Sequence, residues 1–163
     1  MGEIDRSERI DLVYEQRGTE LVARHGDWSA PGWDPDGDGE HSVRAQQRAV
    51  EAYVDRGGVA LGAFAGPRLV GIGIILPHVR PGVAQLAFLH VSDGFRSAGI
   101  GGRLCDELES VARRARDTGI VVSATPSENT VRFYLGRRYE LMPEPFPELY
   151  VLEPDDVHLQ KRL

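Results

Sequence analysis

The sequence contains a single cysteine, Cys105, among its 163 residues. One cysteine can form neither an internal disulfide nor, by itself, a metal site, which excludes a disulfide-stabilised secreted scaffold. We therefore expect a reducing compartment. Because no activating partner for a thiolate is recognisable near Cys105, we predict that it packs in the core and forms no acetyl-cysteine intermediate.

Long apolar runs are also missing. No stretch approaches the roughly 20 apolar residues that a membrane-spanning helix needs, and the first residues, MGEIDRSER, lack the apolar core of a signal peptide. These absences predict a cytoplasmic protein that does not cross a membrane.

Positive charge is in short supply. Lys and Arg number 19 against 25 Asp and Glu, a formal net charge of -6. Because binding to nucleic-acid phosphates needs clustered excess Lys and Arg, the charge argues against a nucleic-acid partner and favours a cationic substrate.

Repeats, low-complexity tracts and long linkers are absent too, so residues 1–163 are expected to form one domain. Asp34, Asp36, Asp38 and Gly39 match the opening of a calcium loop, but its twelfth position falls on Ala45 instead of Glu. We therefore predict no metal site.

Local patterns predict an alternation of helices and strands. Residues 10–24 divide between a strand and a short helix. Residues 25–42 form a loop that could carry Trp28 and Trp33 over a binding cleft as a flap. The remaining expected elements are a helix over 42–56, a hairpin of strands 59–65 and 68–77, a central strand over 83–91 and an amphipathic helix from Ile100 to near Ala115.

The stretch HVSDGFRSAGIGGRL, residues 90–104, joins the central strand to the amphipathic helix. Unpaired N–H groups and the positive end of the helix dipole make such a junction an anion site, and glycines let a phosphate approach. A nucleotide P-loop would need Lys-Ser/Thr after its glycines, and a dinucleotide fingerprint would need glycine at Leu104. A phosphate or pyrophosphate ligand of another kind is expected.

The segment from Arg96 to Gly101, RSAGIG, resembles the R/Q-x-x-G-x-G/A pyrophosphate loop of the GCN5-related N-acetyltransferase (GNAT) family. A valine-rich strand is predicted next, over ATPSENTVRFYLGRRY (residues 124–139). Its Asn129, Phe133 and Tyr134 resemble the family's N-x-x-x-F-Y segment. The resemblance implies an α/β fold of the α+β type. In that fold a central mixed, mostly antiparallel twisted sheet is flanked by helices and splayed at the cofactor strand.

The resemblance also implies how acetyl-CoA would bind. The pantetheine arm would lie beside the strand 83–91, bonded to the backbone at Leu89 and Val91, with an N–H near Leu89 as oxyanion donor. Tyr134 would protonate the departing thiolate. The remaining implied cofactor-binding residues are Arg96, Ser97, Ala98, Gly99, Ile100, Gly101, Gly102, Asn129 and Phe133.

The general base is not identified. Gln85 stands where some family members carry a glutamate. His90 is the candidate in the cofactor strand, although the alternation of a strand points it away from the face of Leu89 and Val91. His78 and a water chain ending at an unidentified carboxylate are the alternatives.

Two further segments depart from or extend the resemblance. Arg138 replaces a glycine that often precedes the aromatic at Tyr139, and we expect it to keep a negative φ. The segment ELYVL (residues 148–152) is predicted as the last strand, and HLQKRL (residues 158–163) as a solvated end.

Two functions follow from the resemblance. The first is direct transfer of an acetyl group from acetyl-CoA to a primary amine of a small molecule, peptide or protein within a ternary complex. The second is an acyl-CoA-binding regulatory module with little turnover, which Gln85 favours. The oligomeric state, a homodimer included, is left open.

Overall fold

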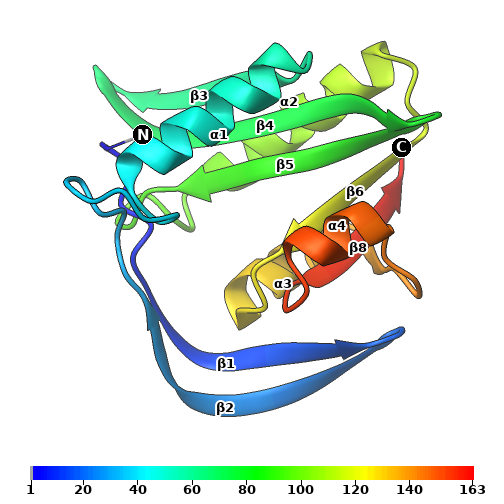
Figure 1. Ribbon diagram of the computed structural model, residues 1–163, viewed down its shortest axis with the longest axis horizontal. Coiled ribbons are helices and arrows are strands. Elements are labelled where there is room, and N and C mark those ends of the chain that lie inside the picture. The colour runs from blue at the N-terminus through cyan, green and yellow to red at the C-terminus, as the bar shows by residue number, and fades with distance from the viewer. Residues whose placement is uncertain (1) are drawn as a thin grey trace.

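The computed structural model describes residues 2–163 and contains one six-stranded sheet and one separate hairpin (Figure 1). The sheet has the strand order β3-β4-β5-β6-β8-β7, and every neighbouring pair in it is antiparallel except β5 and β6, which run parallel. The predicted mixed, mostly antiparallel sheet is confirmed. Its strands are β3 (Val59–Ala65), β4 (Arg68–Arg80), β5 (Val83–Val91), β6 (Gly119–Ala124), β7 (Glu140–Leu141) and β8 (Val157–Arg162).

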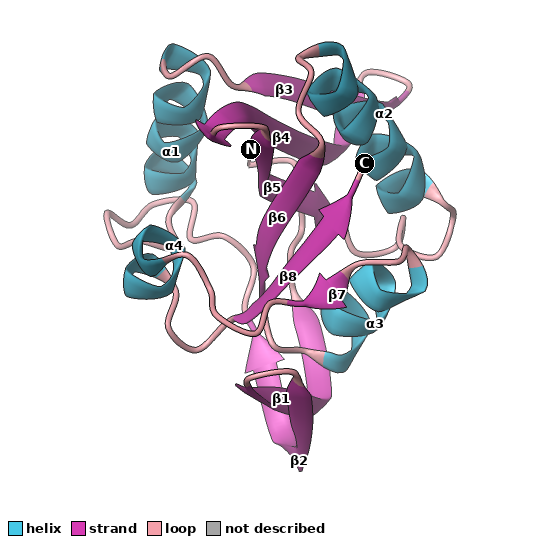
Figure 2. Cartoon of the chain, turned by 90° about the vertical axis from the view of Figure 1, so that its right-hand side faces the viewer, coloured by secondary structure: helices cyan, strands magenta, loops and turns pink. Residues whose placement is uncertain are grey.

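Two helices cover opposite faces of β3, β4 and β5 (Figure 2). Helix α1 (Val43–Asp55) begins at Ser42, whose hydroxyl accepts the N–H of Ala45. Helix α2 (Ile100–Arg114) begins after Gly99, which has a left-handed φ of 79°. Both predicted helices are confirmed.

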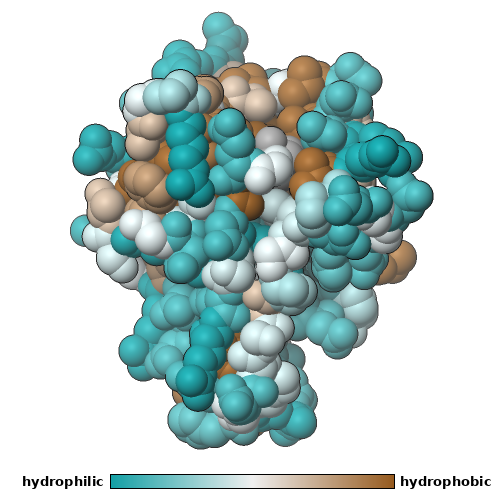
Figure 3. Space-filling view, turned by 90° about the vertical axis from the view of Figure 1, so that its left-hand side faces the viewer, coloured by the Kyte–Doolittle hydropathy of each residue, from teal (hydrophilic) through white to brown (hydrophobic). Residues whose placement is uncertain are grey.

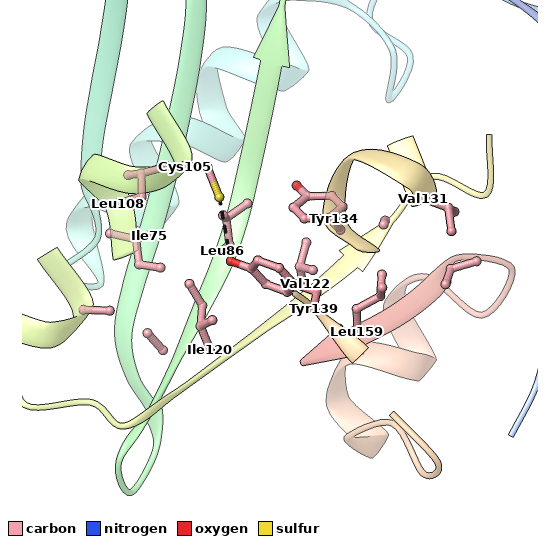
Figure 4. Packing of buried hydrophobic residues seen from close by; sticks show 14 residues of the cluster. Ile75, Leu86, Cys105, Leu108, Ile120, Val122, Val131, Tyr134, Tyr139 and Leu159 are labelled. Carbon is pink, nitrogen blue, oxygen red and sulfur yellow. Dashed lines mark hydrogen bonds between the residues drawn. The ribbon is translucent and has the colours of Figure 1, made fainter. Parts of the chain in front are cut away.

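Helix α2 lies close to β4 because β4 has glycines where the two cross. A Cβ added at Gly73 would lie 2.5 Å from Cδ1 of Leu108, so only glycine leaves room for the helix. The core behind this contact includes Cys105, with no exposed surface, as predicted (Figure 4).

The segment 124–139 is not one strand. The strand ends at Ala124, and Asn129, Phe133 and Tyr134 lie on helix α3 (Glu128–Gly136). Ser127 caps α3 by accepting the N–H of Thr130, which favours a helix over the predicted strand.

The C-terminal prediction is wrong in two places. ELYVL belongs to helix α4 (Pro147–Leu152), which starts with a proline at its first position. HLQKRL is not a solvated end, because it forms most of β8 between β6 and β7. Lys161 of β8 forms a largely buried ion pair of 2.7 Å with Glu109 of α2.

The N-terminal segment is all strand, and no helix forms within residues 10–24. Strands β1 (Glu8–Arg17) and β2 (Glu20–Ala30) form a hairpin that projects below the main sheet (Figure 1). The surface of this projection is mostly hydrophilic (Figure 3). Gln16 attaches the hairpin to the domain, because it accepts the N–H of His158 at 2.7 Å and donates to the Met142 carbonyl at 2.9 Å.

The predicted loop over 25–42 starts later than expected. Residues 25–30 belong to β2, and Trp28 is 41% exposed on that strand. Trp33 lies in the remaining loop and packs edge-on against His90 of β5, with ring centroids 5.3 Å apart.

Among residues 2–163, no helix combines the length and apolar character that crossing a membrane requires.

Candidate active site

Strands β5 and β6 separate after a short parallel ladder. Only Val83, Ala84 and Gln85 of β5 are paired with β6, although β5 continues to Val91 and β6 to Ala124. Leu86 and Phe88 of β5 are opposite the adjacent residues Ile75 and Ile74 of β4, so Ala87 is the one extra residue of a β-bulge. The predicted splay at this strand is present, and it leaves one edge of β5 without a strand partner (Figure 1).

The free edge presents the backbone of two predicted residues. The N–H of Ser92 donates to Val70 of β4, and His90 is opposite Ile72. In an antiparallel ladder the direction of the backbone groups alternates from residue to residue. The backbone groups of Leu89 and Val91 therefore point away from β4, into the space between the separated strands β5 and β6, which we call the gap. Arg96 Nε already donates to the Val91 carbonyl at 3.1 Å, whereas Leu89 carries no such contact.

The loop after β5 gathers the predicted anion-binding residues. Arg96, Ser97, Ala98 and Gly99 form the turn before α2, and Ile100, Gly101 and Gly102 form its first turn. Ser97 and Gly99 both have positive φ, 63° and 79°, which turn the chain sharply into the helix. The first N–H groups of α2 have no partner within the helix, so the segment fits a phosphate.

Helix α3 borders the same gap. A Cβ added at Gly101 would lie 3.5 Å from the Phe133 ring and from Val91, so this ring packs where the loop meets β5. Asn129 lies at the start of α3, where its amide donates to the Glu8 carboxylate of β1 at 2.8 Å. A pantetheine arm would have to replace or share that bond.

Tyr134 is 4% exposed and packs edge-on against Phe133 and Tyr139. Its hydroxyl points from α3 toward Cys105 and the side of β5 (Figure 4). Burial raises the pKa of Tyr134 above its ordinary value, and the neighbouring Cys105 adds to that effect. The phenol is therefore protonated at neutral pH.

The two histidines considered as bases face elsewhere. His90 packs against Phe88 and Trp33 on the face opposite Leu89 and Val91, and burial lowers its pKa to about 4. His78 pairs with the buried Asp117 at 2.9 Å. Gln85 is 8% exposed beside the point where the strands separate.

Several groups at the open end of β6 were not predicted. Ser123 Oγ lies 3.1 Å from Nδ1 of His158, which is 2% exposed. The turn between α4 and β8 brings Glu153 and Asp156 to the same place. The dipeptide Asp155-Asp156 was visible in the sequence, but the helical α4 and the real course of β8 were needed to place it.

Arg138 differs from its prediction as well. Its φ is +66°, so the arginine adopts the left-handed conformation that the family's glycine favours. The turn between α3 and β7 is kept, and the side chain is accommodated with some backbone strain.

The sequence matches a family model described as the acetyltransferase (GNAT) family over residues 23–137. Comparison with curated proteins gives no match.

Solved structures share the fold. An N-acetyltransferase PaiA from Thermoplasma acidophilum, in complex with coenzyme A, has a TM-score of 0.59 and 17% identity over 76% of this chain and 73% of that one. A nourseothricin acetyltransferase has a TM-score of 0.66 and 15% identity over 96% of this chain and 86% of that one. An aminoglycoside 6'-N-acetyltransferase complexed with coenzyme A has a TM-score of 0.63 and 18% identity over 76% of this chain and 82% of that one. The free edge of β5, the glycine-rich turn before α2 and the family match over most of the chain lead to one conclusion: this chain belongs to the GNAT acetyltransferase family.

Proposed function

We propose that the protein is an N-acetyltransferase that moves the acetyl group of acetyl-CoA to a primary amine within a ternary complex. The observation that carries this proposal is the free backbone edge of β5, which ends at the glycine-rich turn before α2 and toward which the Tyr134 hydroxyl points. Two of the three solved structures described above contain coenzyme A, and the free edge of β5 suits the same ligand.

Binding is shared between backbone and side chains. The amides from Arg96 to Gly102 receive the pyrophosphate, and Arg96 adds a positive charge. The pantetheine arm adds to β5 as a strand would, through Leu89 and, once Arg96 moves from its carbonyl, Val91. Asn129 and Phe133 border that arm from α3.

Chemistry follows from two groups on opposite sides of the gap. The Leu89 N–H stabilises the charge that develops on the thioester oxygen. The amine nitrogen forms the new C–N bond as the C–S bond breaks, and Tyr134 gives its proton to the departing thiolate. The acceptor is the primary amine of a small molecule, a peptide or a protein, handled by a single cytoplasmic domain.

The test is thiol release from acetyl-CoA against spermidine, kanamycin, L-lysine and a lysine-containing peptide. We expect turnover with at least one amine, and a fall of about 10²-fold or more in kcat for Tyr134→Phe, with acetyl-CoA binding retained. The conservative Tyr150→Phe, on the exposed side of α4, is the matched control and should keep wild-type turnover.

The alternative, an acyl-CoA-binding regulatory module, rests on the amide of Gln85 at the family's carboxylate position. Tight binding of acetyl-CoA without consumption of any amine, together with no effect of Tyr134→Phe, would favour that function and remove the catalytic role of Tyr134.

A further inference from the structure

The turn between α4 and β8 lies at the open end of β6. Val157, the first residue of β8, is paired with Ala124, the last residue of β6, so Asp156 lies directly beside the open end of β6. The turn is closed by an N–H of Asp156 donating to the Glu153 carbonyl at 3.3 Å. Figure 1 shows this turn on the side where β5 and β6 diverge.

Asp156 is a partly buried carboxylate with no cationic partner. It forms no ion pair with any side chain of residues 2–163, although the chain carries 19 Lys and Arg. A desolvated carboxylate without a partner costs free energy, so such a group persists where a ligand supplies the positive charge. Burial first, and then the charges of Glu153 and Asp155, raise the pKa of Asp156 to about 7.

Asp156 is also coupled to the predicted acid. Its charge contributes to raising the pKa of Tyr134, and Val157, the next residue along the chain, packs in the same hydrophobic cluster as Tyr134. The Tyr134 hydroxyl forms no hydrogen bond with any side chain of residues 2–163, so it is available to a ligand. A proton acceptor and a proton donor therefore lie on segments that pack together near the end of β6.

The other groups around Asp156 do not compete for this role. His158 is buried, its Nδ1 is held by Ser123, and burial lowers its pKa. Glu153 and Asp155 are exposed by surface area, although partial burial raises the pKa of Glu153, and their charges attract a cation to this turn. Tyr53 of α1 lies near Glu153, and its pKa is raised by burial.

We propose that Asp156 binds the ammonium group of the acceptor and takes its proton. The inference rests on the proposed acetyltransferase function and deepens it, because it gives that function its missing base and favours acceptors that carry positive charge. Of the two protons that the ammonium nitrogen loses, one passes through Asp156 to solvent. The other replaces the proton that Tyr134 gives to the thiolate, so the balance of atoms and charge is complete.

Asp156→Asn is the decisive variant, because it keeps the shape and removes the proton acceptor. With the best acceptor of the amine panel, we expect kcat/KM to fall by 10²-fold or more, and acetyl-CoA affinity, measured by calorimetry, to stay within twofold. The limb of the kcat/KM profile near pH 7 should disappear. Glu107→Gln, an exposed acid-to-amide change on α2, is the control and should leave all three readouts unchanged.

The outcomes separate the two proposals. Wild-type protein that acetylates no amine would overturn the proposed function itself. Wild-type turnover with Asp156→Asn retaining both its rate and its pH limb would overturn only this inference. Loss of the limb in His90→Gln and not in Asp156→Asn would likewise overturn it and assign the base to β5. A thermal unfolding temperature of Asp156→Asn at pH 5 that is no lower than that of wild type excludes misfolding as the cause of a lost rate.

Discussion

At the scale of single residues, Asp156 has opposite effects on activity and stability. A carboxyl group with a pKa near 3.8 in the unfolded chain and about 7 in the folded chain binds its proton more tightly when folded. The folded state is therefore penalised as the pH rises from about 4 to 7, and the penalty stays constant above that range. A group needed for proton transfer is kept here at the expense of stability.

Asp156→Asn is accordingly expected to stabilise the free protein at pH 8 by roughly 1–3 kcal/mol. This gain in the free energy of unfolding should be absent near pH 4 and should grow as the pH rises from 4 to 7. Urea unfolding of both proteins across this range measures it. A gain independent of pH would contradict the raised pKa of Asp156.

Arg138 gives a second prediction at this scale. Its φ of +66° is strained for any residue with a Cβ. Arg138→Gly should therefore raise the free energy of unfolding by about 1 kcal/mol despite the greater entropy of glycine in the unfolded chain. Arg138→Ala, which keeps the Cβ, is the control for the lost side chain and should show no such gain.

At the scale of elements, the position of α2 depends on Gly73. A side chain there would collide with Leu108, so Gly73→Val should push α2 away from β4 and destabilise the protein by about 1–3 kcal/mol. Acetyl-CoA should also bind more weakly, because the anion-binding turn moves with the helix. Calorimetry and thermal unfolding measure the two effects.

Ala60→Val in the neighbouring strand β3 is the matched control, because this residue is exposed and valine suits a strand. Equal unfolding temperatures for Gly73→Val and Ala60→Val would contradict the close approach of α2.

The elements also show what the sequence could and could not predict. Strand 83–91, helix α2 and the hairpin of β3 and β4 have strong local patterns, and their bounds were close to those observed. The segment around Asn129 was misread because valine and the aromatics favour a strand, whereas the Ser127 cap and packing against the core select a helix. Pro147 at the start of α4 was a usable signal that the prediction did not weigh.

The candidate site divides in the same way. The turn before α2 and Tyr134 are contiguous motifs, so their residues were found from the sequence. His158 reaches Ser123, and Asp156 reaches the end of β6, only because β8 inserts between β6 and β7, and no local pattern in the sequence reports that pairing. The occupied Val91 carbonyl and the Asn129 bond to Glu8 likewise depend on distant chain segments coming together.

At the scale of the whole molecule, the main sheet consists of two parts. Strands β3, β4 and β5 with α1 and α2 form one, and β6, β7 and β8 with α3 and α4 form the other (Figure 2). The ion pair between Lys161 and Glu109 crosses between them, as does the short ladder of β5 and β6.

That three-residue ladder has a consequence for cooperativity. Because so few hydrogen bonds join the parts, each should open as its own unit in native-state hydrogen exchange, with amides of β4 and β5 reporting one opening free energy and those of β6 and β8 another. A ligand that bonds along β5 and contacts α3 bridges both units. Saturating acetyl-CoA should therefore merge the two opening free energies into one, so that the cosubstrate acts as the missing strand that makes the domain unfold as a whole.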